Sequence, residues 1–271
     1  MTGSQPTRTV FDGDLLRARL TLPAEGAQTL YVTFRQRIDT PGSFADDPPV
    51  RQALARGMAH LHLQSRWNDW YLNAETLALD SALRDLRAGF RQARAVGYSM
   101  GGYALLRLAA ALDLGQALVI SPQFTLDRSV IPRERRYREA ARYDAPLGDL
   151  TRHGKPDLRG AVVFDPSHPL DPIHARLIRQ AMPGMAPAPC MFGGHPATQA
   201  IRAGGGFRDF QALGLGDDLS AAAITRLHRS LRARSSRYWH HRAKACLARG
   251  KTALAEQAMT LAESLSGDDA E

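Results

Sequence analysis

The sequence predicts an α/β fold: a mostly parallel, doubly wound sheet with a small α-helical appendage toward the C-terminal end. Short apolar runs of strand length alternate with segments of helical spacing between residues 58 and 192. Such alternation is typical of parallel strands joined by crossover helices. The part of the chain beyond residue 216 shows helical spacing only. With 271 residues, 44% hydrophobic and 23% charged, the chain is long enough for one such domain plus the appendage.

Two strands precede the alternating region. Apolar, β-branched and aromatic residues alternate or run together over 15–22 and 29–34, and the turn residues Pro23-Ala24-Glu25-Gly26 between them predict a hairpin. The elements expected next are a strand at 58–64, a helix at 74–88, a strand at 94–98 and a helix at 101–112.

The alternation continues as far as a histidine. Strands are expected at 117–121, 160–164 and 188–192, with a helix at 172–182 and a proline- and arginine-rich stretch from 121 to 157. The last strand ends at Gly193-Gly194-His195. A helix at 217–233 then bridges to a helical hairpin that begins at Tyr238.

These elements predict four parts: a flexible N-terminus (1–13), an α/β domain (14–215), C-terminal helices (216–266) and an acidic tail (267–271). Within the C-terminal helices, Trp239, Gly250, Ala255 and Ala262 fall at the spacings of the aromatic and small positions of a tetratricopeptide repeat. Because one repeat cannot bury its apolar face alone, the hairpin is expected to pack on the body, on a second copy in a homodimer, or on a protein partner. Packing within the chain is favoured.

Charge and cysteine content argue against several classes of function. The net charge is +8, and the clusters of positive charge at 133–138 and 232–244 lack the interleaved aromatic residues that stack on bases. We therefore expect no binding of nucleic acid. No apolar run approaches the ~20 residues of a membrane span, and none follows the first charge as in a secretion signal, so no membrane association is expected. Cys190 and Cys246 are predicted to be buried free thiols, which favours the cytoplasm.

The most informative motif is Gly97-Tyr98-Ser99-Met100-Gly101, between an apolar strand and an Ala/Leu-rich helix. A strand that turns directly into a helix at this spacing strains the serine backbone, and glycines on either side let the chain pass closely. Ser99 is then a nucleophile for acyl transfer, and the start of the next helix can hold an oxyanion. The alternative is an ordinary serine in a tight turn of a doubly wound sheet.

A serine nucleophile needs a base, and the base needs an orienting carboxylate. His195 follows the last predicted strand on a glycine-rich loop, in the order serine, acid, histidine. Two acids are candidates. Asp165 comes directly after the strand at 160–164, which narrowly favours it, whereas Asp171 precedes Pro172 in the pattern of a helix N-cap. Because Asp171 could reach His195 if the loop folds back, both remain candidates.

The remaining parts of the site are less distinct. The oxyanion hole would combine the N–H of Met100 with a second N–H from the loop after the strand at 29–34, supplied by Phe34 or Arg35. Trp70 and Tyr71 follow the strand at 58–64 and could form the floor of a substrate pocket, or simply pack in the core. His60 and His62 share a strand face, but two histidines without a carboxylate or thiolate in register do not predict a metal site.

On these residues the chain resembles the α/β-hydrolase superfamily over roughly 15–210, through the Gly-Tyr-Ser-Met-Gly elbow, Asp165 or Asp171, and Gly194-His195. The resemblance implies a serine esterase with a catalytic triad: Ser99 as nucleophile, His195 as general base and one aspartate as orienting acid. It implies no metal and no organic cofactor. The His-Gly stretch of many lipases and esterases is absent after the early strand. Residues 98–104, 121–124 and Trp70-Tyr71 also look like bacterial members found near surface-polysaccharide functions.

The leading hypothesis is thus a hydrolase of a small-molecule ester or thioester, such as an acyl group on a sugar, with residues 133–142 shaping the entrance. A non-catalytic scaffold that binds a partner through its helical tail is the first alternative. An acyltransferase with the same residues is the second, because water and an alcohol compete for the same acyl-enzyme.

Overall fold

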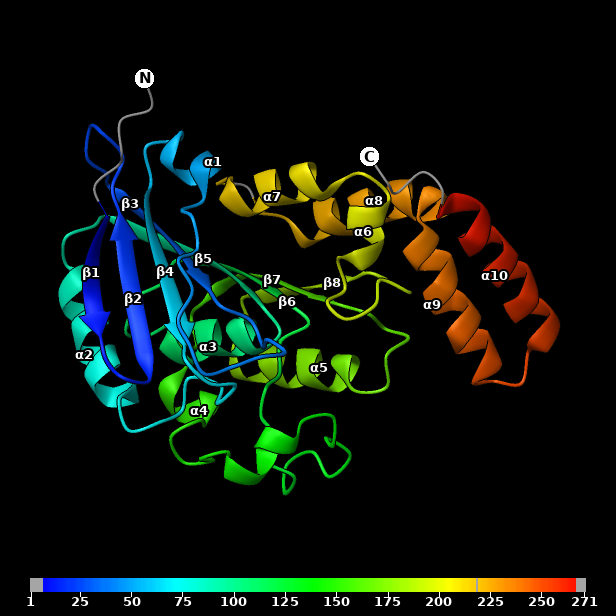
Figure 1. The fold of residues 1–271 in the computed structure, drawn as a ribbon, viewed down its shortest axis with the longest axis horizontal. Coiled ribbons are helices and arrows are strands. Elements are labelled where there is room, and N and C mark those ends of the chain that lie inside the picture. Colours follow the sequence, from blue (N-terminus) through cyan, green and yellow to red (C-terminus); the bar gives the residue numbers. More distant parts are fainter. Residues whose placement is uncertain (1–6, 218, 267–271) are drawn as a thin grey trace.

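The computed structural model describes residues 7–217 and 219–266. Its centre is an eight-stranded sheet in the order β1-β2-β4-β3-β5-β6-β7-β8 (Figure 1). Strands β1 and β2 pair antiparallel, as do β2 and β4, and all other pairs are parallel. The strands are β1 (Thr7–Asp12), β2 (Leu16–Thr21), β3 (Thr29–Phe34), β4 (Ala59–Ser65), β5 (Gln92–Tyr98), β6 (Gln116–Ile120), β7 (Arg159–Phe164) and β8 (Met185–Pro189).

Helices cover both faces of this sheet, which confirms the predicted mostly parallel, doubly wound arrangement. The helices are α1 (Arg51–Leu54), α2 (Thr76–Arg87), α3 (Met100–Leu108), α4 (Leu150–His153), α5 (Asp171–Ala181), α6 (Gln199–Ala203), α7 (Phe207–Leu215), α8 (Ala221–Leu231), α9 (Ser236–Leu247) and α10 (Thr252–Leu265). In Figure 1, α2, α3, α4 and α5 lie on one face, and α1, α7 and α8 lie on the other.

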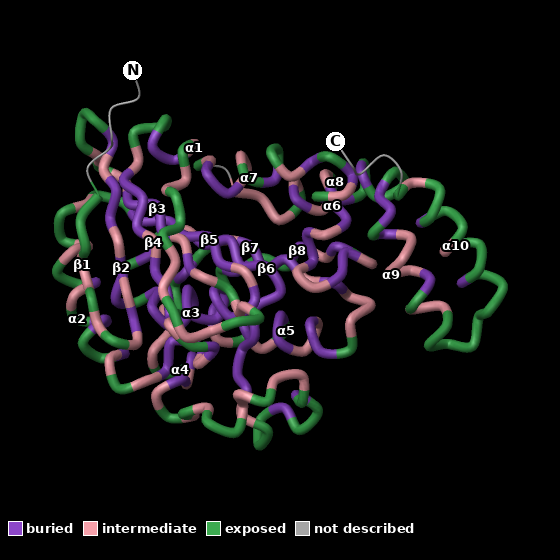
Figure 2. Tube along the Cα trace, in the orientation of Figure 1, coloured by how far each residue is buried: buried purple, intermediate pink, exposed green. Residues whose placement is uncertain are grey.

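Each face of the sheet has its own apolar core. Along β6, Ala117 and Val119 join the core beneath α3 and α5, whereas Leu118 and Ile120 join the core beneath α7 and α8. Because successive side chains of a strand point to opposite faces, a strand covered on both sides must be apolar throughout. This explains the uninterrupted apolar runs in the sequence, and Figure 2 shows the buried residues concentrated along these strands.

The predicted hairpin between residues 15–22 and 29–34 is wrong. Both strands form, but β4 lies between them, antiparallel to β2 and parallel to β3. The connection from residue 22 to residue 28 is long enough to cross one strand, because strands lie about 4.8 Å apart. The hairpin that does form joins β1 to β2.

Two predicted boundaries at the edges of the sheet also need correction. Residues 7–12, expected to belong to a flexible N-terminus, form β1; its side chains are exposed or half-buried, so the apolar signal in the sequence is weak. The last strand is β8 at Met185–Pro189 rather than 188–192. Prolines lack an N–H, but they are tolerated on an edge strand such as β8. The predicted acidic tail at 267–271 and residues 1–6 lie outside the described residues.

The C-terminal helices differ from the prediction in one place. The helix expected at 217–233 is α8, which begins after Ser220, whose side chain accepts a hydrogen bond from the N–H of Ala223. Asp217 is instead paired with Arg94 of β5. Helices α9 and α10 form the predicted hairpin, in which Ala255, Ala258 and Ala262 of α10 are buried. The relation to a tetratricopeptide repeat stays a prediction.

This hairpin packs on the body through α9, which contacts α6, and through the ring of Tyr238, which lies 5.6 Å from that of Phe192. Figure 2 shows exposed residues along the outer side of α10. Both cysteines are free thiols, but only Cys190 is buried, while Cys246 on α9 is half-buried. None of the helices within 7–217 and 219–266 is both long and apolar enough to cross a bilayer.

Candidate active site

Ser99 occupies a strained turn between β5 and α3. Its backbone angles are φ 47° and ψ −119°, in a region that residues other than glycine seldom adopt. A Cβ added to Gly97 would lie 2.5 Å from the carbonyl oxygen of Gly101, and one added to Gly101 would lie 2.9 Å from that of Phe34. The two glycines therefore let the helix start pack directly against β5 and β3, and the turn has the geometry of a nucleophile elbow.

Gly97→Ala should accordingly destabilise the protein. Because the new methyl group would meet backbone atoms, which cannot move independently of α3, we expect a loss of about 3 kcal/mol or more in the free energy of unfolding. Urea unfolding followed by circular dichroism measures this loss. Gly115→Ala is the matched control, since its Cβ would meet only the carbonyl oxygen of Ala93 at 3.8 Å. Equal stability of the two variants would contradict the close packing.

His195 lies beside Ser99 although the two residues are far apart in the sequence. The distance from Ser99 Oγ to His195 Nε2 is 3.1 Å. The histidine stands on the loop after β8, where Gly194 has a φ of +84°. The Ser99 side chain is mostly buried, and the imidazole is a quarter exposed. The structure therefore brings together the two residues on which the predicted chemistry depends.

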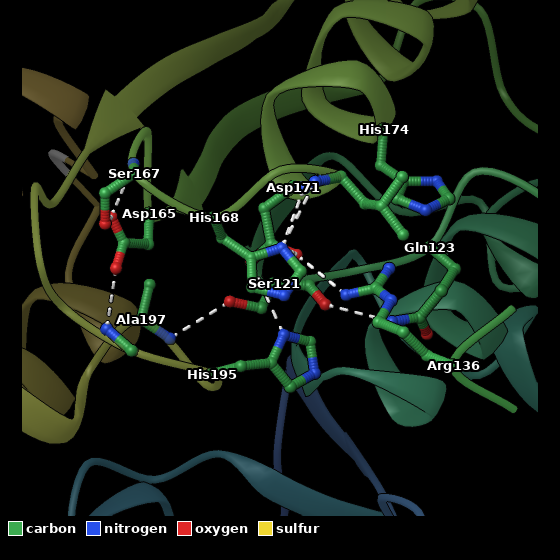
Figure 3. A network of polar contacts seen from close by, with 12 residues as sticks. Ser121, Gln123, Arg136, Asp165, Ser167, His168, Asp171, His174, His195 and Ala197 are labelled. Carbon is green, nitrogen blue, oxygen red and sulfur yellow. Dashed lines mark hydrogen bonds and ion pairs between the residues drawn. The ribbon is translucent and has the colours of Figure 1, made fainter. Parts of the chain in front are cut away.

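Asp171, at the first position of α5, is the acid beside the imidazole. Its Oδ2 lies 3.4 Å from His195 Nδ1. Its side chain does not cap α5, contrary to the N-cap pattern in the sequence, and is free to turn toward the histidine loop. Oδ1 lies 3.0 Å from Arg136 Nη1 and 3.0 Å from His168 Nδ1. Figure 3 shows the carboxylate between these three side chains.

The charge state of Asp171 follows from these partners. Burial alone would raise its pKa, but hydrogen bonds from His168 and His195, and their charges, hold the pKa well below its usual value. Asp171 thus stays ionised throughout the neutral range. An ionised carboxylate at His195 Nδ1 favours the tautomer that carries its proton there and leaves Nε2 free to accept a proton from Ser99.

Asp165, the acid narrowly favoured by the sequence, has a different set of partners. Its Oδ1 accepts hydrogen bonds from Ser167 N at 2.8 Å, Ser167 Oγ at 2.6 Å and Phe192 N at 2.9 Å, and its Oδ2 accepts one from Gly194 N at 3.0 Å. The preference for Asp165 is thereby corrected: backbone N–H groups use both oxygens, and the carboxylate fastens the histidine loop to β7 (Figure 3).

The backbone around the start of α3 revises the expected oxyanion hole. Arg35 N–H, one of the two proposed second donors, is used in the sheet, where it bonds to Leu63 O at 2.9 Å. Phe34, the other proposed donor, is the last residue of β3 and still belongs to the sheet, where it is paired with Leu63 of β4. Among the described residues, neither Met100 N–H nor Gln36 N–H has a hydrogen-bond acceptor. Met100 directly follows Ser99 at the start of α3, and Gln36 lies in the loop after β3.

Trp70 and Tyr71 do not line an open pocket. Both are almost completely buried, and both have positive φ angles, 57° and 61°. The Tyr71 hydroxyl lies 3.0 Å from Arg35 O and 2.9 Å from Leu63 O, so it supports the loop after β3 from below. Trp70 Nε1 donates to Gln123 Oε1 at 3.2 Å. Core packing, the second interpretation of the sequence, describes both residues.

Four residues near the site were missed by sequence analysis as functional side chains: Gln123, Arg136, Tyr137 and His168. Three of them belong to the stretch from 121 to 157, of which residues 133–142 were expected only to shape the entrance. Arg133, Arg135, Arg138 and Arg142 are indeed exposed there, but Arg136 turns inward to Asp171. An isolated arginine or tyrosine in an irregular segment carries no periodic signal, so the sequence alone gives no means to select these residues.

A buried ionic network ties this segment to the acid. Glu134 and His174 are fully buried, with His174 Nε2 2.8 Å from Glu134 Oε2, and Arg136 Nη2 lies 2.6 Å from the same oxygen. His174 Nδ1 accepts from Phe124 N, so its single proton sits on Nε2 and points at Glu134. Burial would raise the pKa of Glu134, but the bonds from His174 and Arg136 lower it to about 2.

This lowered pKa predicts a pH-dependent contribution to stability. Glu134 should stabilise the fold fully above its usual pKa of 4.5 and lose that contribution as the pH falls through about 2. We expect Glu134→Gln to lower the free energy of unfolding by roughly 2 kcal/mol at neutral pH and to flatten its fall in acid. Urea unfolding across this pH range tests it, with the exposed Glu25→Gln as control. A variant with an unchanged acid profile would contradict the network.

No protein-family model and no curated protein sequence matches this chain. Solved structures do match in fold. The capsule O-acetyltransferase of Neisseria meningitidis serogroup A superposes with a TM-score of 0.54 at 12% identity, over 79% of this chain and 98% of that one. The Glycosylation Associate Protein (Gap123) complex of Streptococcus agalactiae superposes with a TM-score of 0.54 at 13% identity, over 78% of this chain and 47% of that one.

The fold is of the α/β-hydrolase type. At these identities the two likenesses show the fold alone. The fold does not fix an activity, because unrelated chemistries use the same architecture. The activity has to be argued from the residues that this chain places at the elbow.

Proposed function

We propose that this chain is a serine hydrolase that cleaves a small ester or thioester through an acyl-enzyme at Ser99. The observation that carries the proposal is the 3.1 Å distance between Ser99 Oγ and His195 Nε2 at a strained elbow. A hydroxyl this close to an unprotonated imidazole nitrogen can lose its proton as it attacks a carbonyl carbon.

The steps follow from the positions of the residues. Ser99 Oγ attacks the acyl carbon while its proton passes to His195 Nε2, and Asp171 stabilises the imidazolium that forms. Met100 N–H and Gln36 N–H hold the oxyanion at the start of α3, where the helix dipole also favours negative charge. His195 then returns the proton to the leaving group, and water attacks the acyl-enzyme in the reverse sense. Asp165 holds the histidine loop in place throughout.

Covalent labelling tests the proposal directly. The purified full-length protein should react with a fluorophosphonate probe, and peptide mass spectrometry should locate the adduct on Ser99. Ser99→Ala should not be labelled, whereas Ser129→Ala, which removes an exposed serine, should label as the wild type does. Wild-type protein that is folded by circular dichroism yet unlabelled, or labelled at another residue, would overturn the proposal.

The same acyl-enzyme serves transfer to an alcohol, so the acceptor has to be tested separately. The meningococcal enzyme that shares the fold is an O-acetyltransferase, and one structure of it is in complex with CoA. Acetyl-CoA is therefore a reasonable second donor, with and without a sugar acceptor. Acetate as product supports hydrolysis, and an acetylated sugar supports transfer.

A further inference from the structure

Two side chains besides the triad stand at the reacting atoms. The Tyr137 hydroxyl lies 3.4 Å from His195 Nε2. Gln123 Nε2 lies 3.5 Å from Ser99 Oγ and donates to the Tyr137 hydroxyl at 3.1 Å. Both residues come from the segment after β6, so this segment adds polar groups to the site.

The orientation of Gln123 fixes the proton of Tyr137. The indole of Trp70 is only a donor, so the Gln123 atom that it contacts at 3.2 Å must be the carbonyl oxygen. The Gln123 amide nitrogen therefore faces Tyr137 and donates to its oxygen. With one lone pair used in this way, the Tyr137 proton is directed at the acceptors that remain, which are His195 Nε2 and Ser99 Oγ.

The surroundings keep Tyr137 in place and protonated. Its ring packs edge-on against that of Trp70, with 4.9 Å between centroids, and the guanidinium of Arg136 lies over it at 5.4 Å. Burial raises the pKa of Tyr137, and the charge of Arg136 offsets this only in part. The hydroxyl is therefore a donor at neutral pH.

We propose that Tyr137 is a catalytic residue on the leaving-group side, whose hydroxyl donates a hydrogen bond to the leaving oxygen or sulfur. This inference rests on the proposed function. When the tetrahedral intermediate breaks down, the carbon–heteroatom bond cleaves and the proton on His195 Nε2 moves to the leaving atom. That atom must lie within reach of Nε2, where the Tyr137 hydroxyl also stands. Tyr137 keeps its own proton, and its hydrogen bond stabilises the negative charge that develops.

Leaving groups of different basicity separate this role from a structural one. Para-nitrophenyl acetate, phenyl acetate and benzyl acetate release increasingly basic leaving groups as they form the same acetyl-enzyme. We expect Tyr137→Phe to lower kcat/KM roughly 100-fold for benzyl acetate but less than about 10-fold for para-nitrophenyl acetate. Gln123→Leu leaves Tyr137 intact but removes the hydrogen bond that orients the Tyr137 hydroxyl. It should show the same trend, with a smaller loss of kcat/KM.

Tyr143→Phe is the matched control. Its hydroxyl lies in the same segment but contacts Tyr103 Oη at 2.9 Å and Gly148 O at 3.1 Å, away from Ser99. The effect of Tyr143→Phe on kcat/KM should not depend on the leaving group. Equal losses of Tyr137→Phe on all three acetates, or no loss, would overturn the inference while leaving the proposed function intact. Wild-type protein that labels at Ser99 but cleaves none of the acetates would also overturn it, whereas failure to label would overturn both proposals.

Discussion

Ser99→Ala should lower kcat for ester hydrolysis roughly 10⁴-fold or more, and His195→Ala should lower it by a similar factor. The Ser99 hydroxyl and the His195 imidazole act as one unit. The hydroxyl is a poor nucleophile without the imidazole, and the imidazole has no proton to accept without the hydroxyl. The double variant should therefore be no slower than either single variant. Rates with para-nitrophenyl acetate, measured on protein of unchanged thermal unfolding midpoint, check this expectation.

The non-additivity is the decisive part of this result. If the two losses multiplied in the double variant, Ser99 and His195 would contribute to separate steps, and their 3.1 Å contact would not be the catalytic one. Ser129→Ala should retain the wild-type rate, because this serine is exposed and its N–H bonds to Asp127 within its own turn. A wild-type rate in Ser99→Ala would remove the case for an acyl-enzyme at this residue.

Asp171→Asn should lower kcat by roughly 10²- to 10⁴-fold. It should also lower the free energy of unfolding, because it removes a buried charge that is paired with Arg136. The amide keeps the shape of the side chain but removes the charge that fixes the tautomer of His195 and stabilises its imidazolium. Asp165→Asn is the matched comparison, since it makes the same change in the other candidate. Its carboxylate accepts four hydrogen bonds, two from Ser167 and two from the histidine loop. We therefore expect a loss of about 2 kcal/mol in the free energy of unfolding and a much smaller loss of kcat.

Two measurements separate the roles of these carboxylates. The rate at saturating substrate reports the effect on chemistry, and urea unfolding reports the effect on the loop. A larger loss of kcat in Asp165→Asn than in Asp171→Asn, at equal fraction folded, would reverse the assignment. It would mean that the histidine loop rearranges in the working enzyme so that Asp165 replaces Asp171 at Nδ1.

The sequence predicted the fold better than the order of its strands. Alternating apolar runs and helical segments indicated a parallel sheet because a strand covered on both faces must be apolar at every position. Strand order is set by pairing between segments distant in the chain, and local patterns carry no record of it. The turn at Pro23–Gly26 looked like a hairpin, yet β4 lies between the two strands that it joins.

Within the candidate site, too, local sequence patterns identified some residues, and contacts between distant segments decided the others. Ser99 and His195 were found from local signals, the glycine spacing of the elbow and the glycine-rich loop after the last strand. The acid could not be selected in this way, because Asp165 and Asp171 are six positions apart on one loop and differ only in where that loop turns. Arg136, Tyr137 and Gln123 lie in an irregular segment. Its path over the site depends on long-range contacts with Trp70, Asp171 and His174.

By itself, then, the sequence determined the class of fold and selected a candidate nucleophile and a candidate base. It could do so because steric limits on a strand-to-helix turn and the periodicity of burial act over a few neighbouring residues. Only the tertiary structure decided which carboxylate meets the imidazole, which N–H groups remain free at the elbow, and which side chains of the arginine-rich segment turn inward. These depend on distances between atoms far apart in the chain, which are fixed only when both cores are packed and the backbone of the loops is hydrogen-bonded.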